Sequence, residues 1–355
     1  MTVATALLVT RDEALLEDVL RLTAAAGAVL EVAHDSPAAL RSWGSAPVVL
    51  VGADQLSAVC QQHPARRHQV HVISSTPVSD DLFRAALAIG AESVVELPSA
   101  ESWLVELLTD IADGGARTAT TIGVVGGSGG AGATTFAAAL ALTAARGAGQ
   151  VLLVDADPFG GGIDRVVGLE DLDGIRWDSL EHTSGRFSSK SLREALPQRD
   201  GLAVLTWAGG PRCVTDAVAV REVLSAAQRG SDTVVVDLPR YPDPMATEIL
   251  SRCDHVVLVA GLTVPAVAAA SRVAAHIQDH DRCTSLVTRG GAAALSAEDV
   301  SRALDIPLAA AMANQRRLVE SVELGLGPVQ ARRGPLARAA GTVLDRIGEA
   351  LTRAT

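Results

Sequence analysis

The chain has 355 residues, 48% of them apolar, so it is long enough for two ordinary domains and too apolar to be disordered throughout. A net charge of -11 argues against a generally basic surface that coats nucleic acid. The four cysteines lack CxxC spacing, which favours reduced thiols over a disulfide framework or a zinc site. No segment reaches the roughly 18 apolar residues of a membrane span, and we expect a cytoplasmic protein.

Residues 1–112 alternate short apolar runs with helical patterns. This alternation predicts a parallel sheet with crossover helices. Residues 113–120 mix glycine, alanine and threonine without periodicity, which is typical of a linker between two domains. The predicted strands of the first domain are residues 5–10, 29–33, 47–52, 70–75 and 93–97.

The order of these elements and the segment AIGAESVVELP resemble a response-regulator receiver domain, which has a flavodoxin-like fold. In a working receiver, an acidic pair holds Mg²⁺, an aspartate ends the third strand and a lysine precedes the last proline. Asp12 and Glu13 match the acidic pair. The resemblance therefore implies a receiver-like α/β domain, and a plain α/β domain unrelated to receivers is the alternative.

The residues that would handle a phosphoryl group are missing from this domain. Gly52 stands where the acceptor aspartate would be, and Leu97 replaces the lysine. Asp54 lies two residues past the acceptor position, and we expect it to be a solvated loop aspartate. The first domain is therefore predicted to be a pseudo-receiver that docks or dimerises and does not switch by phosphorylation.

Residues 121–355 continue the alternation in a longer segment, which predicts a three-layer α/β domain with a mainly parallel sheet. Predicted strands lie near residues 121–126, 150–154, 202–206, 233–237, 255–260 and 283–288. Predicted helices lie near residues 134–146, 213–229, 266–280, 313–324 and 336–352.

A glycine-rich loop joins the first strand of this domain to its first helix. Residues 127–134, GSGGAGAT, have the phosphate-binding spacing GxxxxGK[ST] with alanine in the place of lysine. Glycines permit positive φ and leave backbone N–H groups free to surround phosphate oxygens at a helix N-terminus. The residues expected to contact a nucleotide are Gly127, Gly129, Gly130, Ala131, Gly132, Ala133, Thr134 and Thr135.

Two further predicted strands carry aspartates at their carboxyl ends, namely Asp155 with Asp157 and, farther along, Asp237. The carboxyl ends of parallel strands meet at one edge, so we expect these side chains beside the loop. Asp155 and Asp237 complete the predicted nucleotide site, and Thr134 and Asp155 are the predicted Mg²⁺ ligands. Asp157 and Asp237 are the catalytic candidates if the chain hydrolyses a nucleotide.

On these motifs, residues 121–355 resemble the ParA/MinD superfamily of deviant-Walker positioning ATPases. The loop reads approximately GKGGxGKTT in that family and GSGGAGATT here. The resemblance implies ATP or ADP with Mg²⁺ as the ligand and a homodimer as the assembly. This chain departs from the family at three positions: Ser128 replaces the signature lysine, Ala133 the Walker lysine and Thr288, before Arg289, the adenine-contacting asparagine.

The loss of both lysines predicts a site that binds nucleotide weakly and hydrolyses it little or not at all. A lysine about 4 Å from a phosphate oxygen contributes on the order of 4 kcal/mol at an effective dielectric of about 20. Cationic stabilisation of the transferring phosphoryl group is worth roughly 10³ to 10⁵ in rate. The alternative is an active ATPase in which Arg240 or Arg165 replaces a missing lysine.

Three other patterns suggest weaker sites. His276 and His280 have a metal-binding spacing without an accompanying carboxylate, so we expect a solvated helix end. The amphipathic helix near 336–352 is expected to pack on the sheet, with a peripheral membrane contact as the alternative. A DNA contact is the alternative for Arg316, Arg317, Arg332 and Arg333.

A pseudo-receiver followed by a degenerate ParA/MinD domain resembles the CpaE/TadZ-like group, to which septum-site-determining proteins of actinobacteria are related. The resemblance implies a spatial-positioning protein that regulates cell division through protein contacts at the septum, the pole or the inner membrane face. The alternative within the same group is a localisation factor for pilus or secretion assembly.

Overall fold

The computed structural model describes residues 5–65, 67, 69–112, 119–147, 149–180, 189–209, 217–280, 282–290, 295–330 and 334–354. The chain divides into two compact units, residues 1–117 with 185–190, and residues 118–184 with 191–355. Most of the expected linker, residues 113–118, lies outside the described residues, as does Cys213. The described cysteines, Cys60, Cys253 and Cys283, are free thiols.

The first unit contains one parallel sheet in the order β2-β1-β3-β4-β5 among its described residues. This is the flavodoxin-like order, which confirms the predicted receiver-like fold. The strands are β1 (Thr5–Val9), β2 (Val29–Ala33), β3 (Val49–Gly52), β4 (Val70–Ser74) and β5 (Ser93–Glu96). The helices are α1 (Glu13–Ala26), α2 (Ser36–Ser42), α3 (Ala53–Gln61), α4 (Asp80–Ala88) and α5 (Glu101–Ala112).

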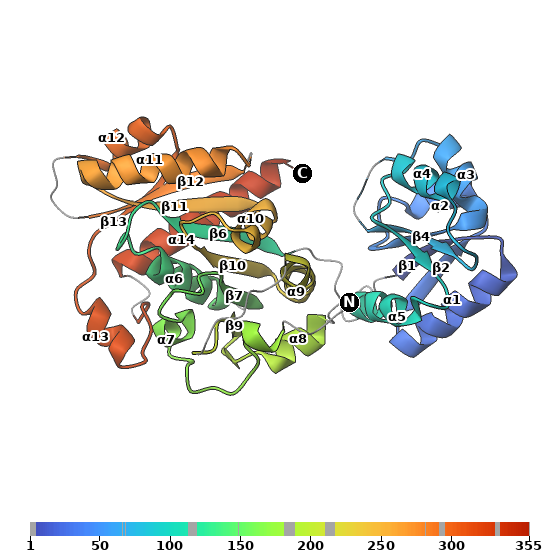
Figure 1. The fold of residues 1–355 in the computed structure, drawn as a ribbon, viewed down its shortest axis with the longest axis horizontal. Coiled ribbons are helices and arrows are strands. Elements are labelled where there is room, and N and C mark those ends of the chain that lie inside the picture. Colours follow the sequence, from blue (N-terminus) through green and yellow to red (C-terminus); the bar gives the residue numbers. More distant parts are fainter. Residues whose placement is uncertain are drawn as a thin grey trace. The chain divides into compact units, whose positions relative to one another are not determined.

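Helices cover both faces of this sheet (Figure 1). Successive side chains of a strand point to opposite faces, and β1 is apolar on both. Ala6 and Leu8 pack with α1 and α5, whereas Leu7 and Val9 pack with α2, α3 and α4. The sheet is therefore the buried central layer of three.

The second unit contains a sheet in the order β13-β12-β11-β6-β10-β7-β9-β8, which is parallel except for the β8–β9 pair. Its strands are β6 (Thr120–Gly126), β7 (Val151–Asp155), β8 (Gln198–Arg199), β9 (Leu202–Leu205), β10 (Thr233–Leu238), β11 (His255–Gly261), β12 (Cys283–Arg289) and β13 (Leu308–Met312). The helices after β6 are α6 (Ala133–Ala145), α7 (Ile163–Val167), the 3₁₀ turn η1 (Trp177–Ser179), α8 (Ser189–Ala195), α9 (Ala217–Gly230), α10 (Pro244–Ser251), α11 (Val264–Gln278), α12 (Ala297–Leu304), α13 (Leu318–Glu323) and α14 (Pro335–Ala354).

This sheet also forms the middle of three layers (Figure 1). α6 and α14 pack together on one face, and α9, α10, α11 and α12 lie on the other. Phe136 and Leu140 of α6 are fully buried, so the helix after the glycine loop is held firmly against the sheet. The predicted three-layer domain with a mainly parallel sheet is confirmed.

Several elements of the second unit differ from the prediction, and β8, α7, α8, α10 and α12 were not expected. The helix expected near 313–324 begins only at Leu318, because Arg317 before it has φ 58°, a left-handed value that a helix does not continue. β13 was not expected, since its sequence LAAAM carries little strand propensity and its pairing with β12 holds it. The helix expected from 213 is described from Ala217 onward.

Candidate functional site

The loop between β6 and α6 has the backbone of a phosphate-binding turn. Gly130 and Gly132 have φ of 71° and 93°, left-handed values that favour glycine, and Gly132 caps the N-terminus of α6. Gly127 is required for another reason, because a Cβ there would lie 2.6 Å from Cβ of Ala270 in α11. The N–H of Gly127 also donates to the carbonyl of Val259 at 2.8 Å. The loop is therefore anchored to α11 and β11 where it begins.

The loop borders a pocket of about 420 Å³ at the carboxyl edge of the sheet, which we call the loop pocket. The N-terminus of α6 lies beside it, and the first N–H groups of a helix lack intrahelical partners, which favours a bound anion. Two carboxylates and two guanidinium groups border the same space. The residues lining the loop pocket are Gly126, Ser128, Gly129, Gly130, Ala131, Gly132, Ala133, Thr134, Thr135, Asp157, Asp237, Leu238, Pro239, Arg240 and Arg289.

The structure brings together all of the predicted nucleotide-contacting residues except Gly127 and Asp155. Gly127 is packed against α11, as described above, and thus has a structural role. Thr288, expected at the adenine position, is 1% exposed and does not line the loop pocket; its hydroxyl has no hydrogen-bond partner among the described residues. Contact of the other residues with a nucleotide stays a prediction.

Asp155 and Asp237 are paired across the register of β7 and β10. Asp155 is 2% exposed, and it accepts hydrogen bonds from the N–H of Asp157, the N–H of Ile163 and the hydroxyl of Thr206. Burial nevertheless raises the pKa of Asp155 to about 6, because these bonds only partly offset desolvation. Asp155 thus holds the turn after β7 in place.

Asp237 is the buried carboxylate of the loop pocket, with 4% of its surface exposed. Burial raises its pKa to about 7; a hydrogen bond from Thr134 lowers it, and the charges of Asp155 and Asp157 raise it further. The hydroxyl of Thr134 and the carboxylate of Asp237 are therefore hydrogen-bonded to each other. The described residues contain no group of three or more His, Cys, Asp or Glu side chains arranged to hold a metal ion, so the Mg²⁺ ligands stay a prediction.

Arginines stand where the sequence pattern lacks lysine. Arg240 follows β10 and Arg289 ends β12, and both line the loop pocket. Arg289 was not expected to line the loop pocket. Its position at the end of β12 could have predicted this placement, because the carboxyl end of β12 lies at the same edge of the sheet as the loop. Arg165, the other proposed substitute, lies elsewhere and donates to the carbonyl of Gly161.

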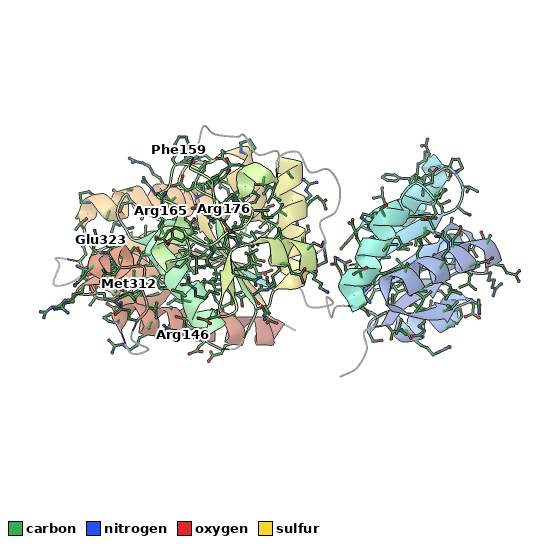
Figure 2. All side chains as sticks on the ribbon, turned by 90° about the horizontal axis from the view of Figure 1, so that it is seen from below. Arg146, Phe159, Arg165, Arg176, Met312 and Glu323 are labelled. Carbon is green, nitrogen blue, oxygen red and sulfur yellow. The ribbon has the colours of Figure 1, made fainter. Side chains whose placement is uncertain are left out.

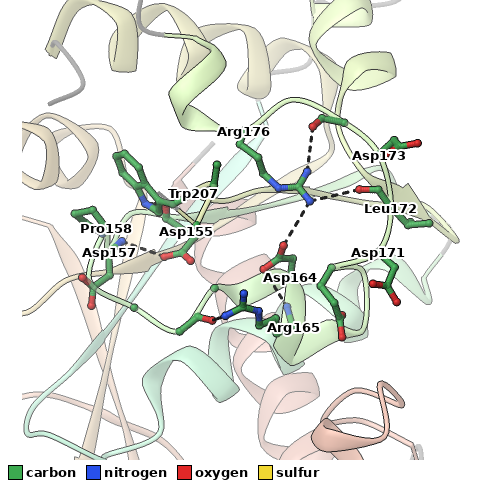
Figure 3. Close-up of a pocket in the computed structure, with 17 residues that line it drawn as sticks. Asp155, Asp157, Pro158, Asp164, Arg165, Asp171, Leu172, Asp173, Arg176 and Trp207 are labelled. Atoms are coloured by element: carbon green, nitrogen blue, oxygen red, sulfur yellow. Dashed lines mark hydrogen bonds and ion pairs between the residues drawn. The ribbon is translucent and has the colours of Figure 1, made fainter. Parts of the chain in front are cut away.

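Arg165 belongs to a second pocket of about 520 Å³, which also contains Asp155 and Trp207 (Figure 3). Several polar groups of this second pocket contact one another. Arg176 lies 3.5 Å from Asp164 and donates to the carbonyl of Leu172, and Trp207 donates to the carbonyl of Asp155. Figure 2 shows the positions of Arg165 and Arg176 in the whole unit. Both arginines of the second pocket are therefore held by groups of that pocket.

In the first unit, the side chain of Asp54 occupies the space beside Gly52, which is the acceptor position of a receiver. Asp54 was expected to be a solvated loop residue, but it lies in the first turn of α3 and accepts from the Thr10 hydroxyl at 2.8 Å and the Arg11 N–H at 2.7 Å. Burial alone would raise the pKa of Asp54, but these bonds and one from Gln55 hold it below its ordinary value. The expectation of a loop residue was wrong, because Asp54 belongs to α3, whereas its exposure to solvent is as expected.

The other receiver positions also have structural roles. Asp12, expected in the acidic pair, is the N-cap of α1 and accepts from the N–H groups of Ala14 and Leu15. Leu97, in the place of the lysine, is 4% exposed and belongs to the core beneath α1 and α5. These positions are used for folding, in agreement with a pseudo-receiver.

The weaker patterns are resolved in part. The rings of His276 and His280 stack edge to face at 5.2 Å, at the end of α11. Ala340 and Val343 of α14 are fully buried in the core shared with α6, so this helix packs on the sheet as expected. Among the described helices, none is both long and apolar enough to cross a membrane. Arg332 and Arg333 lie outside the described residues.

Comparison with known proteins finds relatives of both units. A family model described as the Rv3660c-like, CheY-like N-terminal domain matches residues 9–119. The uncharacterized protein Rv3660c of Mycobacterium tuberculosis (strain ATCC 25618 / H37Rv) is 36% identical over 346 residues, which cover 96% of this chain and 97% of that protein. The pseudo-receiver and the unit that follows it therefore occur together in this relative.

Solved structures resemble the second unit. A ParA family ATPase from Chlorobium tepidum TLS has a TM-score of 0.57 at 15% identity, covering 63% of this chain and 96% of that chain. The MinC:MinD cell division protein complex of Aquifex aeolicus matches with a TM-score of 0.57 at 22% identity. The match covers 65% of this chain and 96% of that chain. The septum site-determining protein MinD with Mg-ADP from Pyrococcus horikoshii OT3 has a TM-score of 0.56 at 20% identity. The match covers 64% of this chain and 96% of that chain. The expected ParA/MinD fold is confirmed.

Proposed function

The chain belongs to the Rv3660c family, and from this premise and the geometry of the loop pocket we propose that it is a positioning protein of cell division. It marks or inhibits a septum site through protein contacts, and it hydrolyses ATP little or not at all. The ParA/MinD fold of the second unit supports a role in positioning. The pseudo-receiver supports control by docking, because its acceptor position holds no aspartate.

One observation supports low hydrolytic activity: the loop pocket keeps the left-handed glycines of a phosphate cradle but has no lysine among its lining residues. Ser128 and Ala133 occupy the two lysine positions, and neither side chain can carry positive charge. The single lysine of the chain, Lys190, belongs to a segment grouped with the first unit. Without the two lysines that would stabilise the transferring phosphoryl group, turnover is expected to fall by roughly 10³ to 10⁵.

The residues present fit a nucleoside phosphate. Gly130 and Gly132 have the left-handed backbone that such a cradle needs, and the pocket is large enough for a polyphosphate chain. Thr134 and Asp155, the proposed Mg²⁺ ligands, and Asp237 present oxygen atoms, which are the ligands that Mg²⁺ prefers. These residues would hold ATP or ADP with Mg²⁺, and the metal would neutralise phosphate charge. Mg-ADP in the structure of MinD supports this assignment.

The proposed partners are proteins of the division machinery and a second copy of the chain. The MinC:MinD complex supports the first, because its MinD has the fold of the second unit. We propose recruitment of the chain to the septum, the pole or the inner membrane face.

Depletion of the protein in cells that encode it tests this function, together with a fluorescent fusion that reports where the protein gathers. We expect displaced septa, a broadened distribution of cell lengths and fluorescence at septa or poles. Pilus assembly and secretion are scored in the same cells. Normal septa together with lost pili or lost secretion would contradict the division role and support the localisation factor instead.

A further inference from the structure

Two arginines, one that follows β10 and one that ends β12, flank the glycine loop. Nη1 of Arg289 lies 2.6 Å from the position of a Cβ at Gly132, and Nη2 of Arg240 lies 3.8 Å from that of a Cβ at Gly129. A side chain at Gly132 would compete with the guanidinium group of Arg289 for space, whereas 3.8 Å at Gly129 is an ordinary contact distance. The loop thus has one arginine close to each end.

Arg289 is held in place by two contacts. Its Nε donates to Oδ1 of Asn314 at 3.2 Å, and its Nη1 is 3.4 Å from the carbonyl oxygen of Gly130. Its other terminal nitrogen, Nη2, has no partner among the described residues. A guanidinium fixed at one edge retains donors at the other, and this planar fork matches the oxygens of a phosphate.

Arg240 is less restrained. It is exposed, and among the residues that the structure describes it has no hydrogen bond or ion pair, although Asp157 and Asp237 line the same pocket. Its side chain lies over the start of the loop, where Cδ is 3.7 Å from the position of a Cβ at Gly126. All of its donors therefore remain available to an anion in the loop pocket.

We propose that Arg289 and Arg240 supply the positive charge that Ser128 and Ala133 cannot, and that the loop pocket binds the polyphosphate of a nucleoside di- or triphosphate through them. This inference rests on the proposed function only in retaining the nucleotide site. Both guanidinium groups reach the loop from outside its backbone, so neither takes the covalent position of the Walker lysine. The arrangement supports binding of phosphate without implying its transfer.

Isothermal titration of the full chain with inorganic tripolyphosphate in the presence of Mg²⁺ tests the proposal. Arg289→Ala and Arg240→Ala are each expected to weaken binding about 10-fold to 100-fold, as for loss of a charge-assisted hydrogen bond. Arg289→Lys keeps the charge but not the fork, and it should recover part of the affinity. Binding should also weaken as salt is raised, because exposed charges are screened.

Arg165→Ala is the matched control, because this arginine lies at the same edge of the sheet but in the second pocket. Its affinity for tripolyphosphate should equal that of the unmodified chain, and thermal unfolding of each variant shows whether the fold is intact. No binding by the unmodified chain, equal binding by Arg289→Ala, or tighter binding by Arg289→Ala would overturn the proposal. The last result would mean that Arg289 blocks the loop. Septum placement in cells is measured separately, so failure here leaves the proposed division role standing.

Discussion

The carboxylate of Asp54 fills the space that a side chain at Gly52 would need. A Cβ at residue 52 would overlap Oδ1 of Asp54 and lie 2.9 Å from the hydroxyl oxygen of Thr10. The residue at the end of β3 is therefore glycine because the first turn of α3 folds its aspartate back over the strand. A phosphoryl acceptor at this position would displace the hydrogen bonds that join β1 to α3.

Gly52→Ala should lower the local stability of the first unit by about 1–3 kcal/mol, because the new methyl group overpacks the site. Hydrogen exchange of peptides from β1 and β3 measures this effect without requiring the two units to unfold together. Gly44→Ala is the matched control, since no described atom lies within 4 Å of its Cβ position. Removing the obstructing carboxylate in the double variant Gly52→Ala, Asp54→Ala should recover part of the loss. Equal hydrogen exchange in Gly52→Ala and Gly44→Ala would contradict this account.

Gly127→Ala tests whether the loop depends on its packing against α11. The added Cβ would lie 2.6 Å from Cβ of Ala270, so the loop or the helix must move. We expect about 1–3 kcal/mol less protection in peptides from α11 and weaker binding of tripolyphosphate. Gly161→Ala, in the turn after β7, has no described atom within 4 Å of its Cβ position and should leave both unchanged. Full protection of α11 in Gly127→Ala would show that the contact is not limiting.

Asp237 predicts a pH dependence of stability. Its pKa is raised from 3.8 to about 7 in the folded chain, so between these values the folded state keeps a proton that the unfolded state releases. The free energy of unfolding should therefore fall as pH rises from about 4 to about 7, by on the order of 4 kcal/mol. Asp237→Asn removes the part of this decline that Asp237 causes and keeps an oxygen for the hydroxyl of Thr134, whereas the part due to Asp155 remains.

Chemical denaturation at several pH values, compared between Asp237→Asn and the unmodified chain, measures this difference. Glu298→Gln removes an exposed carboxylate of the same unit and serves as the control. The stability of Asp237→Asn relative to the unmodified chain should increase from pH 4 to pH 8. A constant difference over this range would show that the buried carboxylate is not the cause.

Much of the fold was predictable, because apolar runs and helical patterns alternate in both units. The parallel sheets follow from that alternation, and the left-handed φ of Gly130 and Gly132 from the spacing of the loop. The position of Asp237 beside the loop was also predictable, because the carboxyl ends of parallel strands lie at the same edge of a sheet.

The contacts between distant side chains were not predictable. Arg289 reaches a loop that lies far from it in sequence, and its direction depends on Asn314. The hydrogen bonds of Asp54 were not expected, because nothing in the local sequence shows that Thr10 and the Arg11 N–H lie opposite it. Such contacts depend on strand order and rotamers, which periodicity does not contain.

The central claim is that the loop retains the geometry for binding phosphate without the two lysines that would drive its cleavage. Release of inorganic phosphate from ATP by the purified chain, with Mg²⁺, tests it most directly. We predict the same background rate for the unmodified chain and for Asp237→Ala. Measurable turnover that Asp237→Ala abolishes would contradict the claim, because it would show that the chain is a working ATPase despite Ser128 and Ala133.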